Sequence, residues 1–428
     1  MQKGQPPPRL ALLCFPVVSV RTMTQSLSPR ARVARVAVLV VNWLSRVSGR
    51  GSGTVAGGRV GLAICPDLLG QLANDRIVLL VSGTNGKTTT SAMMATGWGG
   101  DVTANATGAN MAPGHVAALV RSHHPRVVLE VDEAWLPDVV RSTRPAVVVL
   151  LNLSRDQLDR ASEVRQLAER WRQCFSDDQN ESLVVVANAN DPMVVFAASG
   201  AQRVRWCDVP TPWLGDATSC PRCTRPLAHE NNTWGCTCGF SRPSTMTTTL
   251  NHGLDVAGVH VDLALLMPGT FNEANAAMAV TALAEVGIAP HDAMPRINAL
   301  SGVAGRFTLR QWGDHRFRLS LAKNPAGFAA ILSTIDPASA DVWVAINANI
   351  ADGRDPSWLY DVPFESLRGH RVYCLGDRRL DLATRLEYAN VDFRVVDDQS
   401  LLPVADAPVA LLANYTAFSD WLEKSAGC

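Results

Sequence analysis

The sequence predicts an α/β protein with a doubly wound parallel sheet, a small cysteine-rich insertion and a smaller C-terminal α/β domain. Short β-branched apolar runs alternate with helical stretches, and the first run is followed directly by a glycine-rich turn and a helix. These runs are Ile77–Gly83, Val127–Glu133, Ala146–Leu153 and Leu183–Asn188. With 428 residues, 47% of them hydrophobic, the chain is long enough for two or three domains.

The N-terminal part is predicted as an extension, residues 1–29, that is disordered or mis-assigned. The apolar stretch Leu10–Val20 resembles a secretory signal, but no clear small-x-small cleavage site follows it, and Met23 is an alternative start. A helix is predicted over residues 30–46, with an apolar stripe and arginines beside it. That helix either covers the first core or lies on a membrane surface. No apolar run reaches the length of about 20 residues that a spanning helix needs.

The remaining chain divides into two predicted domains. A central ATP-binding domain covers residues 30–304, with a zinc-ribbon-like insertion at 206–249, where the alternating pattern stops. A second α/β domain covers residues 305–428, with strands expected at Val342–Asn347, Arg371–Gly376 and Pro408–Asn414.

The charge balance and the cysteines restrict the class of protein. Lys and Arg number 39 and Asp and Glu number 39, so a strongly basic nucleic-acid binder is not expected. Ten cysteines occur, of which four are packed into residues 220–238, a distribution typical of a metal site and not of a disulfide framework. We therefore expect a reducing, cytoplasmic location.

The segment VSGTNGKTTTSAMM, residues 81–94, has the strand–turn–helix context of a phosphate-binding loop. Its backbone N–H groups can hold phosphate oxygens, Lys87 can reach the β- and γ-phosphates, and the Thr88 hydroxyl can bind Mg²⁺. The generic pattern has glycine where this chain has Val81, so a plain glycine-rich turn is the alternative. The predicted nucleotide-binding residues of the loop are Gly83, Thr84, Asn85, Gly86, Lys87, Thr88 and Thr89.

Four cysteines form a second candidate site. Cys220-x₂-Cys223 and Cys236-x-Cys238 lie within 19 residues, a spacing that favours one structural Zn²⁺ ion. The second pair is C-x-C instead of C-x-x-C, which leaves Cys207 as a possible substitute ligand and free thiols as the alternative. The segment has no basic face, so we expect it to stabilise the fold and not to bind nucleic acid.

The run SGTNGKTTT resembles the phosphate loop of the Mur ligases and folylpolyglutamate synthases, which activate a carboxylate with ATP to make an amide bond. Five further motifs follow in the same order: LEVDEAWLP, NLSRDQLDR, NANDP, FNEANAAMAVTAL and GRF. Within that superfamily, TGANM, AKNPAG, DGRDPSW and the four-cysteine insertion are similar to the MurT-type branch, the ligase-like subunits of lipid II isoglutaminyl synthase. The resemblance covers about residues 30 to 420 and implies a Mur ligase-like central P-loop ATPase domain.

The resemblance implies roles for residues outside the loop. Glu130 corresponds to an acidic magnesium ligand, Arg306 to an arginine that reaches the ATP phosphates, and Asp191, Asn272 and Asn275 to residues near the nucleotide. For Asn272 a helix cap is the alternative. Asp132 and Glu133 are either helpers or charges at a helix N-terminus.

Two departures from the family pattern are visible. Many relatives have DHLD where this chain has Asp156-Gln157-Leu158-Asp159, and they commonly use a carbamylated lysine. No lysine occurs between Lys87 and Lys323, a gap that by resemblance the MurT-type branch shares.

The implied reaction is amidation of the D-glutamate α-carboxyl of the lipid II stem peptide to D-isoglutamine through an acyl phosphate. No glutaminase nucleophile motif is present, so ammonia is expected from a GatD-like glutaminase subunit in a heterodimer. The resemblance implies that an aspartate of DGRD, Asp355 or secondly Asp352, completes the partner's site, and that Lys323 and Asn324 lie near the domain cleft. A folylpolyglutamate-type amino-acid ligase and a nucleotide-gated zinc scaffold are the alternatives. A lipid-linked substrate implies peripheral contact with the inner membrane face.

Overall fold

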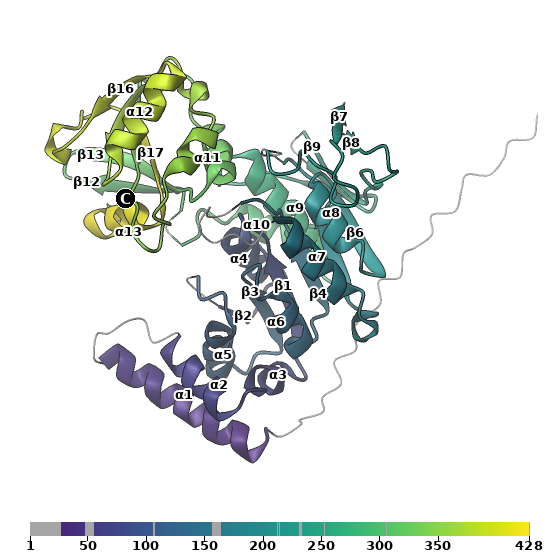
Figure 1. Ribbon diagram of the computed structural model, residues 1–428. Helices are drawn as coiled ribbons and strands as arrows, with labels where there is room; N and C mark the ends of the chain where they lie inside the picture. The colour runs from purple at the N-terminus through teal and green to yellow at the C-terminus, as the bar shows by residue number, and fades with distance from the viewer. Residues whose placement is uncertain are drawn as a thin grey trace, which may run out of the picture.

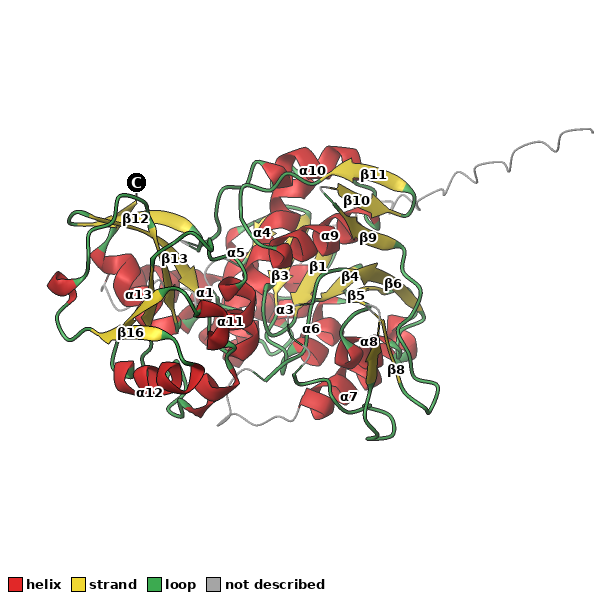
Figure 2. Cartoon of the chain, turned by 90° about the horizontal axis from the view of Figure 1, so that it is seen from above, coloured by secondary structure: helices red, strands yellow, loops and turns green. Residues whose placement is uncertain are grey.

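The computed structural model describes residues 27–47, 55–105, 108–155, 164–211, 213, 215–230, 233–251, 253–304 and 306–427. Two α/β domains lie side by side, with the C-terminal domain shown in yellow-green in Figure 1. In each domain helices cover a sheet (Figure 2). Most of the predicted N-terminal extension, residues 1–26, lies outside the described residues.

The central sheet, within the described residues, has nine strands in the order β11-β10-β9-β6-β5-β4-β1-β3-β2. The strands β2, β3, β1, β4, β5, β6 and β9 pair in parallel. At the edge of the sheet, β10 pairs antiparallel with β9, and β11 pairs antiparallel with β10. The strands are β1 (Ile77–Ser82), β2 (Thr103–Ala104), β3 (Arg126–Glu130), β4 (Val147–Leu150), β5 (Val184–Asn188), β6 (Arg203–Asp208), β9 (Thr247–Leu250), β10 (Gly253–Val256) and β11 (Val259–Asp262). The four strands predicted from apolar runs are confirmed as β1, β3, β4 and β5, with ends shifted by up to three residues.

Helices cover both faces of this sheet. One layer contains α4 (Lys87–Trp98), α9 (Thr270–Ala284) and α10 (Pro290–Asn298). The other contains α1 (Pro29–Val47), α2 (Ala56–Ile64), α3 (Leu68–Ala73), α5 (Ala112–Arg121), α6 (Leu136–Thr143), α7 (Val164–Phe175), the 3-10 helix η1 (Asp178–Asn180) and α8 (Pro192–Ala198). Leu79 and Val81 of β1 pack in the core beneath the α4, α9 and α10 layer. Val78 and Leu80 point to the other face and pack in the core beneath the second helix layer. Burial on both faces explains why these strands are apolar without alternation.

The cysteine-rich insertion projects between β6 and β9 and contains the hairpin β7 (Ala228–Glu230) and β8 (Thr233–Gly235). Residues 206–208 and 247–249, expected in the insertion, belong instead to β6 and β9. Both segments are short and mixed in polarity, so the sequence pattern alone does not mark them as strands. Trp234 and Phe240 are buried, and the Phe240 ring packs edge-on against Phe196 of α8.

The C-terminal sheet, within the described residues, has seven strands in the order β16-β15-β14-β17-β13-β12-β18. They are β12 (Thr308–Trp312), β13 (His315–Leu321), β14 (Asp341–Ala345), β15 (Arg371–Leu375), β16 (Asp392–Val395), β17 (Val409–Ala413) and β18 (Ala426–Gly427). The helices are α11 (Pro325–Leu332), α12 (Arg379–Ala389), α13 (Tyr415–Lys424) and the 3-10 helices η2 (Ser357–Asp361), η3 (Phe364–Leu367) and η4 (Gln399–Leu401). The three strands predicted here are confirmed as β14, β15 and β17.

Candidate nucleotide site

The phosphate loop connects β1 to α4, in the middle of the parallel sheet. Gly83 has φ of 142° and Gly86 has φ of 88°, a region that side-chain-bearing residues rarely adopt. A Cβ at Gly86 would meet Asn275 Oδ1 at 2.6 Å, and a Cβ at Gly83 would meet Leu151 Cβ at 2.9 Å. Both glycines are therefore needed for the conformation and for the close approach of neighbouring residues.

This geometry predicts the effect of one methyl group. Gly86→Ala should weaken ATP binding by about tenfold or more, because strain at positive φ and the contact with Asn275 both distort the loop. Gly258→Ala is the matched control: Gly258 has φ of 84°, but a Cβ there would meet nothing within 4 Å. Isothermal titration of both variants with ATP checks this. Equal affinities for the two variants would contradict the steric argument.

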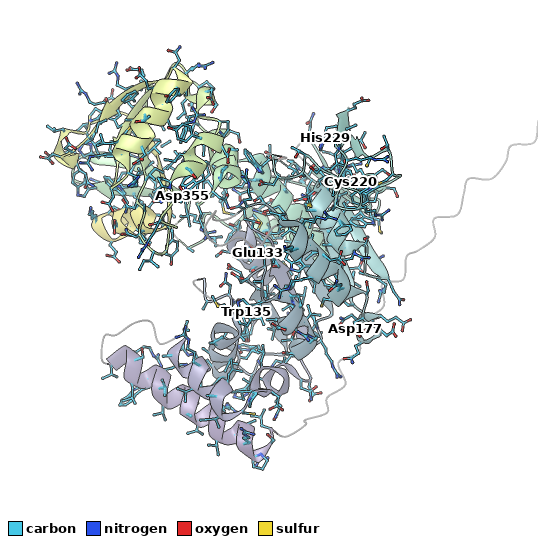
Figure 3. All side chains as sticks on the ribbon, in the orientation of Figure 1. Glu133, Trp135, Asp177, Cys220, His229 and Asp355 are labelled. Carbon is cyan, nitrogen blue, oxygen red and sulfur yellow. The ribbon has the colours of Figure 1, made fainter. Side chains whose placement is uncertain are left out.

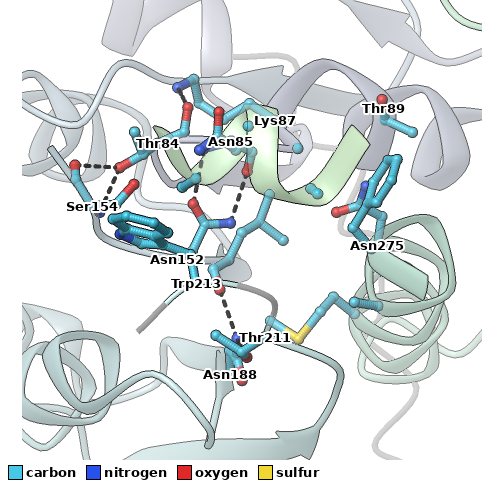
Figure 4. A pocket seen from close by; sticks show the side chains of 18 of the residues that line it. Thr84, Asn85, Lys87, Thr89, Asn152, Ser154, Asn188, Thr211, Trp213 and Asn275 are labelled. Carbon is cyan, nitrogen blue, oxygen red and sulfur yellow. Dashed lines mark hydrogen bonds between the residues drawn. The ribbon is translucent and has the colours of Figure 1, made fainter. Parts of the chain in front are cut away.

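Residues 152–154, which follow β4, hydrogen-bond to the phosphate loop and stabilise its conformation. The Asn152 side chain accepts from the Asn85 N–H at 2.9 Å and donates to the Asn85 carbonyl at 3.0 Å. The Thr84 hydroxyl donates to the Ser154 carbonyl at 3.0 Å and accepts from the Ser154 N–H at 2.9 Å (Figure 4). In the sequence, Asn152 and Ser154 are visible only as members of the motif NLSRDQLDR, without this supporting role.

Lys87 is buried at the start of α4. Its Nζ donates to the Gly83 carbonyl at 2.6 Å and the Thr84 carbonyl at 3.2 Å, and it forms an ion pair with Glu133 Oε1 at 2.6 Å. Burial raises the pKa of the Glu133 carboxyl, and the charge of Lys87 opposes that shift. Of the two alternatives for Glu133, the ion pair supports the helper role over a simple helix-terminus charge.

Thr88 and Glu130 form a pair of hard oxygen groups beside Lys87. The Thr88 hydroxyl donates to Glu130 Oε2 at 2.8 Å. The backbone of Glu130 is fixed by Asn105, whose amide accepts from the Glu130 N–H at 2.8 Å and donates to the Glu130 carbonyl at 2.9 Å. The same carbonyl lies 2.9 Å from Nε2 of His115, whose pKa burial lowers to about 4, so the ring is neutral. The Thr88 hydroxyl and the Glu130 carboxylate are oxygen groups of the kind that Mg²⁺ prefers as ligands.

The loop opens into a pocket between the two domains. The central domain lines it with the phosphate loop, Glu130, Asn188, Asp191 and Asn275. The Asp191 carboxylate caps α8 by accepting from the Met193 and Val194 N–H groups, and it also accepts from the Leu153 N–H at 2.8 Å. Burial raises the pKa of Asp191 to about 6 despite these donors. Asp191 therefore fixes the pocket wall.

The two predicted asparagines of α9 have different positions. Asn275 lines the pocket (Figure 4), whereas Asn272 is fully buried and donates to the Pro268 carbonyl at 2.6 Å. The Asn272 Oδ1 accepts from the Asn275 amide at 3.5 Å. Of the two asparagines predicted at the nucleotide, only Asn275 therefore lines the pocket, and the buried Asn272 holds the Asn275 side chain.

The C-terminal side of the pocket is formed by Arg306, Phe307, Lys323 and α11. Burial lowers the pKa of the Arg306 guanidinium, and the carboxylate of Glu130 opposes that shift. Asn324 joins the domains: its Oδ1 accepts from Asn85 Nδ2 at 3.1 Å and from the Gly327 N–H at 2.8 Å. The expectation that Lys323 and Asn324 lie at the domain cleft is confirmed.

The two aspartates of DGRD differ in exposure. Asp352 is buried, and its carboxylate accepts from the Thr416 N–H, the Thr416 hydroxyl and the Asn349 N–H. Asp355 is exposed on the C-terminal domain (Figure 3), and its carboxylate accepts from the Ser357 N–H at 2.9 Å; hydrogen bonds from the Ser357 backbone and side chain lower the pKa of Asp355. Neither aspartate lines the pocket. Asp355 is the one that a second protein can reach.

The four cysteines of the insertion converge. Their sulfurs all lie within 4.8 Å of one another, with Cys220 and Cys238 Sγ 3.7 Å apart and Cys223 and Cys236 Sγ 3.4 Å apart. In a tetrahedral site with Zn–S bonds of about 2.3 Å, the sulfurs would be about 3.8 Å apart. Cys207 is not the substitute ligand, because it is buried in β6 with its sulfur 3.6 Å from the Thr281 hydroxyl. Both cysteines of the C-x-C pair, Cys236 and Cys238, therefore belong to the four-sulfur cluster.

Two sets of predicted residues cannot be placed. Asp156-Gln157-Leu158-Asp159 and Gly305, the first residue of the GRF motif, lie outside the described residues. Among the described residues, no helix is both long enough and apolar enough to cross a membrane.

Comparison with known families decides the classification. Residues 81–209 match the Mur ligase middle domain, and residues 321–418 match the MurT ligase C-terminal domain. The chain belongs to the Mur ligase family. It is an ATP-dependent ligase, and ATP and Mg²⁺ are the nucleotide and metal that this family uses.

Mur ligase relatives match over almost the whole chain. The MurT subunit of the glutamine-hydrolysing lipid II isoglutaminyl synthase of Staphylococcus aureus strain COL is 28% identical over 89% of this chain and 94% of its own length. The corresponding Streptococcus pneumoniae subunit is 25% identical over 89% of this chain and 94% of its own length.

Solved structures support the fold. A pseudomurein peptide ligase type C from Methanothermus fervidus superposes with a TM-score of 0.63 at 20% identity, covering 82% of this chain and 79% of that one. MurF from Acinetobacter baumannii superposes with a TM-score of 0.61 at 14% identity, covering 86% and 81%.

Proposed function

We propose that this ligase amidates the D-glutamate α-carboxyl of the lipid II stem peptide to D-isoglutamine, as a step of peptidoglycan synthesis. The observation that carries the proposal is the pocket between the domains, in which Lys87 and Glu130 of the central domain face Arg306 and Lys323 across one space. The full-length similarity to lipid II isoglutaminyl synthase subunits supports the choice of substrate. A lipid-linked substrate places the enzyme at the inner membrane face during turnover.

The reaction has two steps. An oxygen of the substrate carboxylate attacks the γ-phosphorus of ATP, and the bond to the β-phosphate oxygen breaks to leave ADP and an acyl phosphate. Ammonia then attacks the acyl carbon, inorganic phosphate leaves, and the nitrogen loses a proton. The first step turns a poor leaving group into a good one.

Three charged residues act on the transferring phosphoryl group. Lys87 and Arg306 stabilise its negative charge from opposite sides of the pocket, and the burial of Lys87 and partial burial of Arg306 strengthen this interaction. Glu130 and the Thr88 hydroxyl would hold Mg²⁺, and the bound ion would neutralise phosphate charge. Before nucleotide binds, the Lys87 ammonium is neutralised by Glu133. The phosphate groups compete for that ammonium when ATP enters.

Ammonia comes from a GatD-like glutaminase that forms a heterodimer with this chain. The exposed, ionised carboxylate of Asp355 contacts the partner's catalytic centre. Asp355→Asn should lower glutamine-driven amidation by about tenfold or more and leave ammonium-driven amidation unchanged. Asp352→Asn is the comparison: it disturbs the bonds to Thr416 and should lower stability and both activities together. If Asp355→Asn lost both activities equally, the partner role would be wrong.

We propose that the four-cysteine cluster would hold one structural Zn²⁺ ion. The insertion braces the pocket wall, because Trp234 Nε1 donates to the Ala189 carbonyl at 3.1 Å and Arg242 bonds to Asn190 Oδ1 at 2.5 Å, beside Asn188 and Asp191.

Cys236→Ser should therefore remove the zinc, lower the free energy of unfolding by about 2 kcal/mol or more, and weaken ATP binding. Cys174→Ser, a half-buried thiol outside the cluster, is the control. Metal content, thermal unfolding and ATP titration measure the three effects. Full zinc content in the Cys236 variant would contradict the ligand assignment.

The function is tested by measuring phosphate release and amidated product with ATP, Mg²⁺ and lipid II, supplied with ammonium or with the glutaminase and glutamine. We expect product with both nitrogen sources. Product with an amino acid and no partner would instead favour a folylpolyglutamate-type ligase. ATP binding without phosphate release from any acceptor would favour a nucleotide-gated scaffold.

A further inference from the structure

The helix α1 carries large apolar side chains on its solvent side. Val33, Val36, Leu39, Val40, Trp43 and Leu44 are between 40% and 62% exposed. They recur at the spacing of one helical face, which we call the outer face of α1. Figure 1 shows α1 at the edge of the molecule, away from the cysteine-rich insertion and the C-terminal domain.

The opposite side of α1 needs no large apolar residues. Its buried residues are Ala31, Ala34, Val38 and Asn42, which pack toward α2 and α5. The core side of α1 thus holds nothing larger than Val38 and Asn42, whereas leucine and tryptophan face solvent, the reverse of a helix whose apolar residues serve folding. The sequence left two alternatives for this helix, covering the core or lying on a membrane surface. The structure is compatible with both, because the inner side covers the core and the outer face is available for another contact. A contiguous exposed apolar face of this kind marks an interaction surface.

The charge around the outer face restricts its partner. Residues 1–66 contain nine basic and no acidic residues, although the whole chain has a net charge of zero. Arg32 and Arg46 are exposed on α1 itself. Helices that lie in the interface of an anionic membrane have this composition: valine, leucine and tryptophan on one face, arginines beside them, and no carboxylates.

We propose that the outer face of α1 docks on an anionic lipid bilayer, with the helix parallel to the surface. The apolar side chains enter the boundary between headgroups and acyl chains, and the arginines contact lipid phosphates. The docking itself does not depend on the reaction, but its purpose rests on the proposed function, since it would hold the pocket near a lipid-linked substrate.

Vesicle flotation tests the docking. The full-length protein should float with vesicles of phosphatidylglycerol and phosphatidylcholine, much less with phosphatidylcholine alone, and less at high salt. Val36→Glu combined with Val40→Glu should weaken binding by about tenfold or more, because two carboxylates enter the apolar face. Leu380→Glu combined with Tyr388→Glu, at exposed apolar positions of α12, should bind like the native protein.

Thermal unfolding and ATP binding of the double variants confirm that both still fold. The proposal is overturned if the native protein does not float, or if the Val36/Val40 variant floats as well as native protein, as it would if another segment made the contact. It is also overturned if the native protein is a dimer that this variant dissociates, because the face then belongs to a second copy. Flotation requires neither ATP nor lipid II, so a failure of the amidation proposal leaves its result unaffected.

Discussion

Lys87→Ala should reduce ATP-dependent phosphate release and amide formation by about a thousandfold or more. The ammonium is held at the phosphate loop by the Gly83 and Thr84 carbonyls, and the lysine at this place in a phosphate loop contacts the β- and γ-phosphates of the bound nucleotide. Removing it also leaves the buried Glu133 carboxylate without its cation. The loss in turnover should therefore be accompanied by weaker ATP binding.

Two further variants separate these effects. Lys424→Ala removes a lysine from α13, outside the pocket, and should retain full activity. Lys87→Ala combined with Glu133→Gln removes the unpaired carboxylate, so it should regain stability but not turnover. Single-turnover phosphate release and thermal unfolding measure the two quantities. Turnover within tenfold of native in Lys87→Ala would remove the phosphate loop from the mechanism.

Glu130→Gln should lower turnover by about a hundredfold and raise the Mg²⁺ concentration required for activity. The amide has the shape of the carboxylate and can still accept from the Thr88 hydroxyl, so the fold should be preserved while the negative charge is lost. It also removes the charge that opposes the lowering of the Arg306 pKa.

The Mg²⁺ dependence distinguishes a metal ligand from a merely structural carboxylate. Glu130→Asp keeps the charge on a shorter side chain and should recover part of the activity at high Mg²⁺. Asn105→Ala is the structural comparison, because it releases the backbone of Glu130 without changing the ligand charge. If Glu130→Gln required the same Mg²⁺ concentration as native enzyme, Glu130 would not be a magnesium ligand.

The local sequence pattern predicted those parts of the site that are formed by residues adjacent in the chain. The strand, the two positive-φ glycines and the helix start at Lys87 are contiguous, so β1 and α4 could be located before any tertiary contact was known. The same holds for Glu130, which ends β3. The convergence of the four cysteines followed from their spacing alone.

Long-range contacts could not be predicted in this way. Asn152 supports the loop from 67 residues away, and Asn324 contacts it from 239 residues away, so neither role has a local signal. The sequence also could not show which aspartate of DGRD is exposed, because that depends on the packing of Asp352 against Thr416 of α13. The boundaries of the insertion were placed too widely for the same reason, since β6 and β9 become strands by joining the central sheet.

Oxygen transfer from substrate to phosphate tests the central claim most directly. The D-glutamate α-carboxyl of the acceptor is labelled with ¹⁸O, and the enzyme is supplied with ATP, Mg²⁺ and ammonium. Activation of the carboxylate by ATP predicts one ¹⁸O atom in the inorganic phosphate for each amide formed, measured by mass spectrometry. Amide formation with unlabelled phosphate would contradict the account, because the γ-phosphoryl group would then have passed to water and not to the substrate.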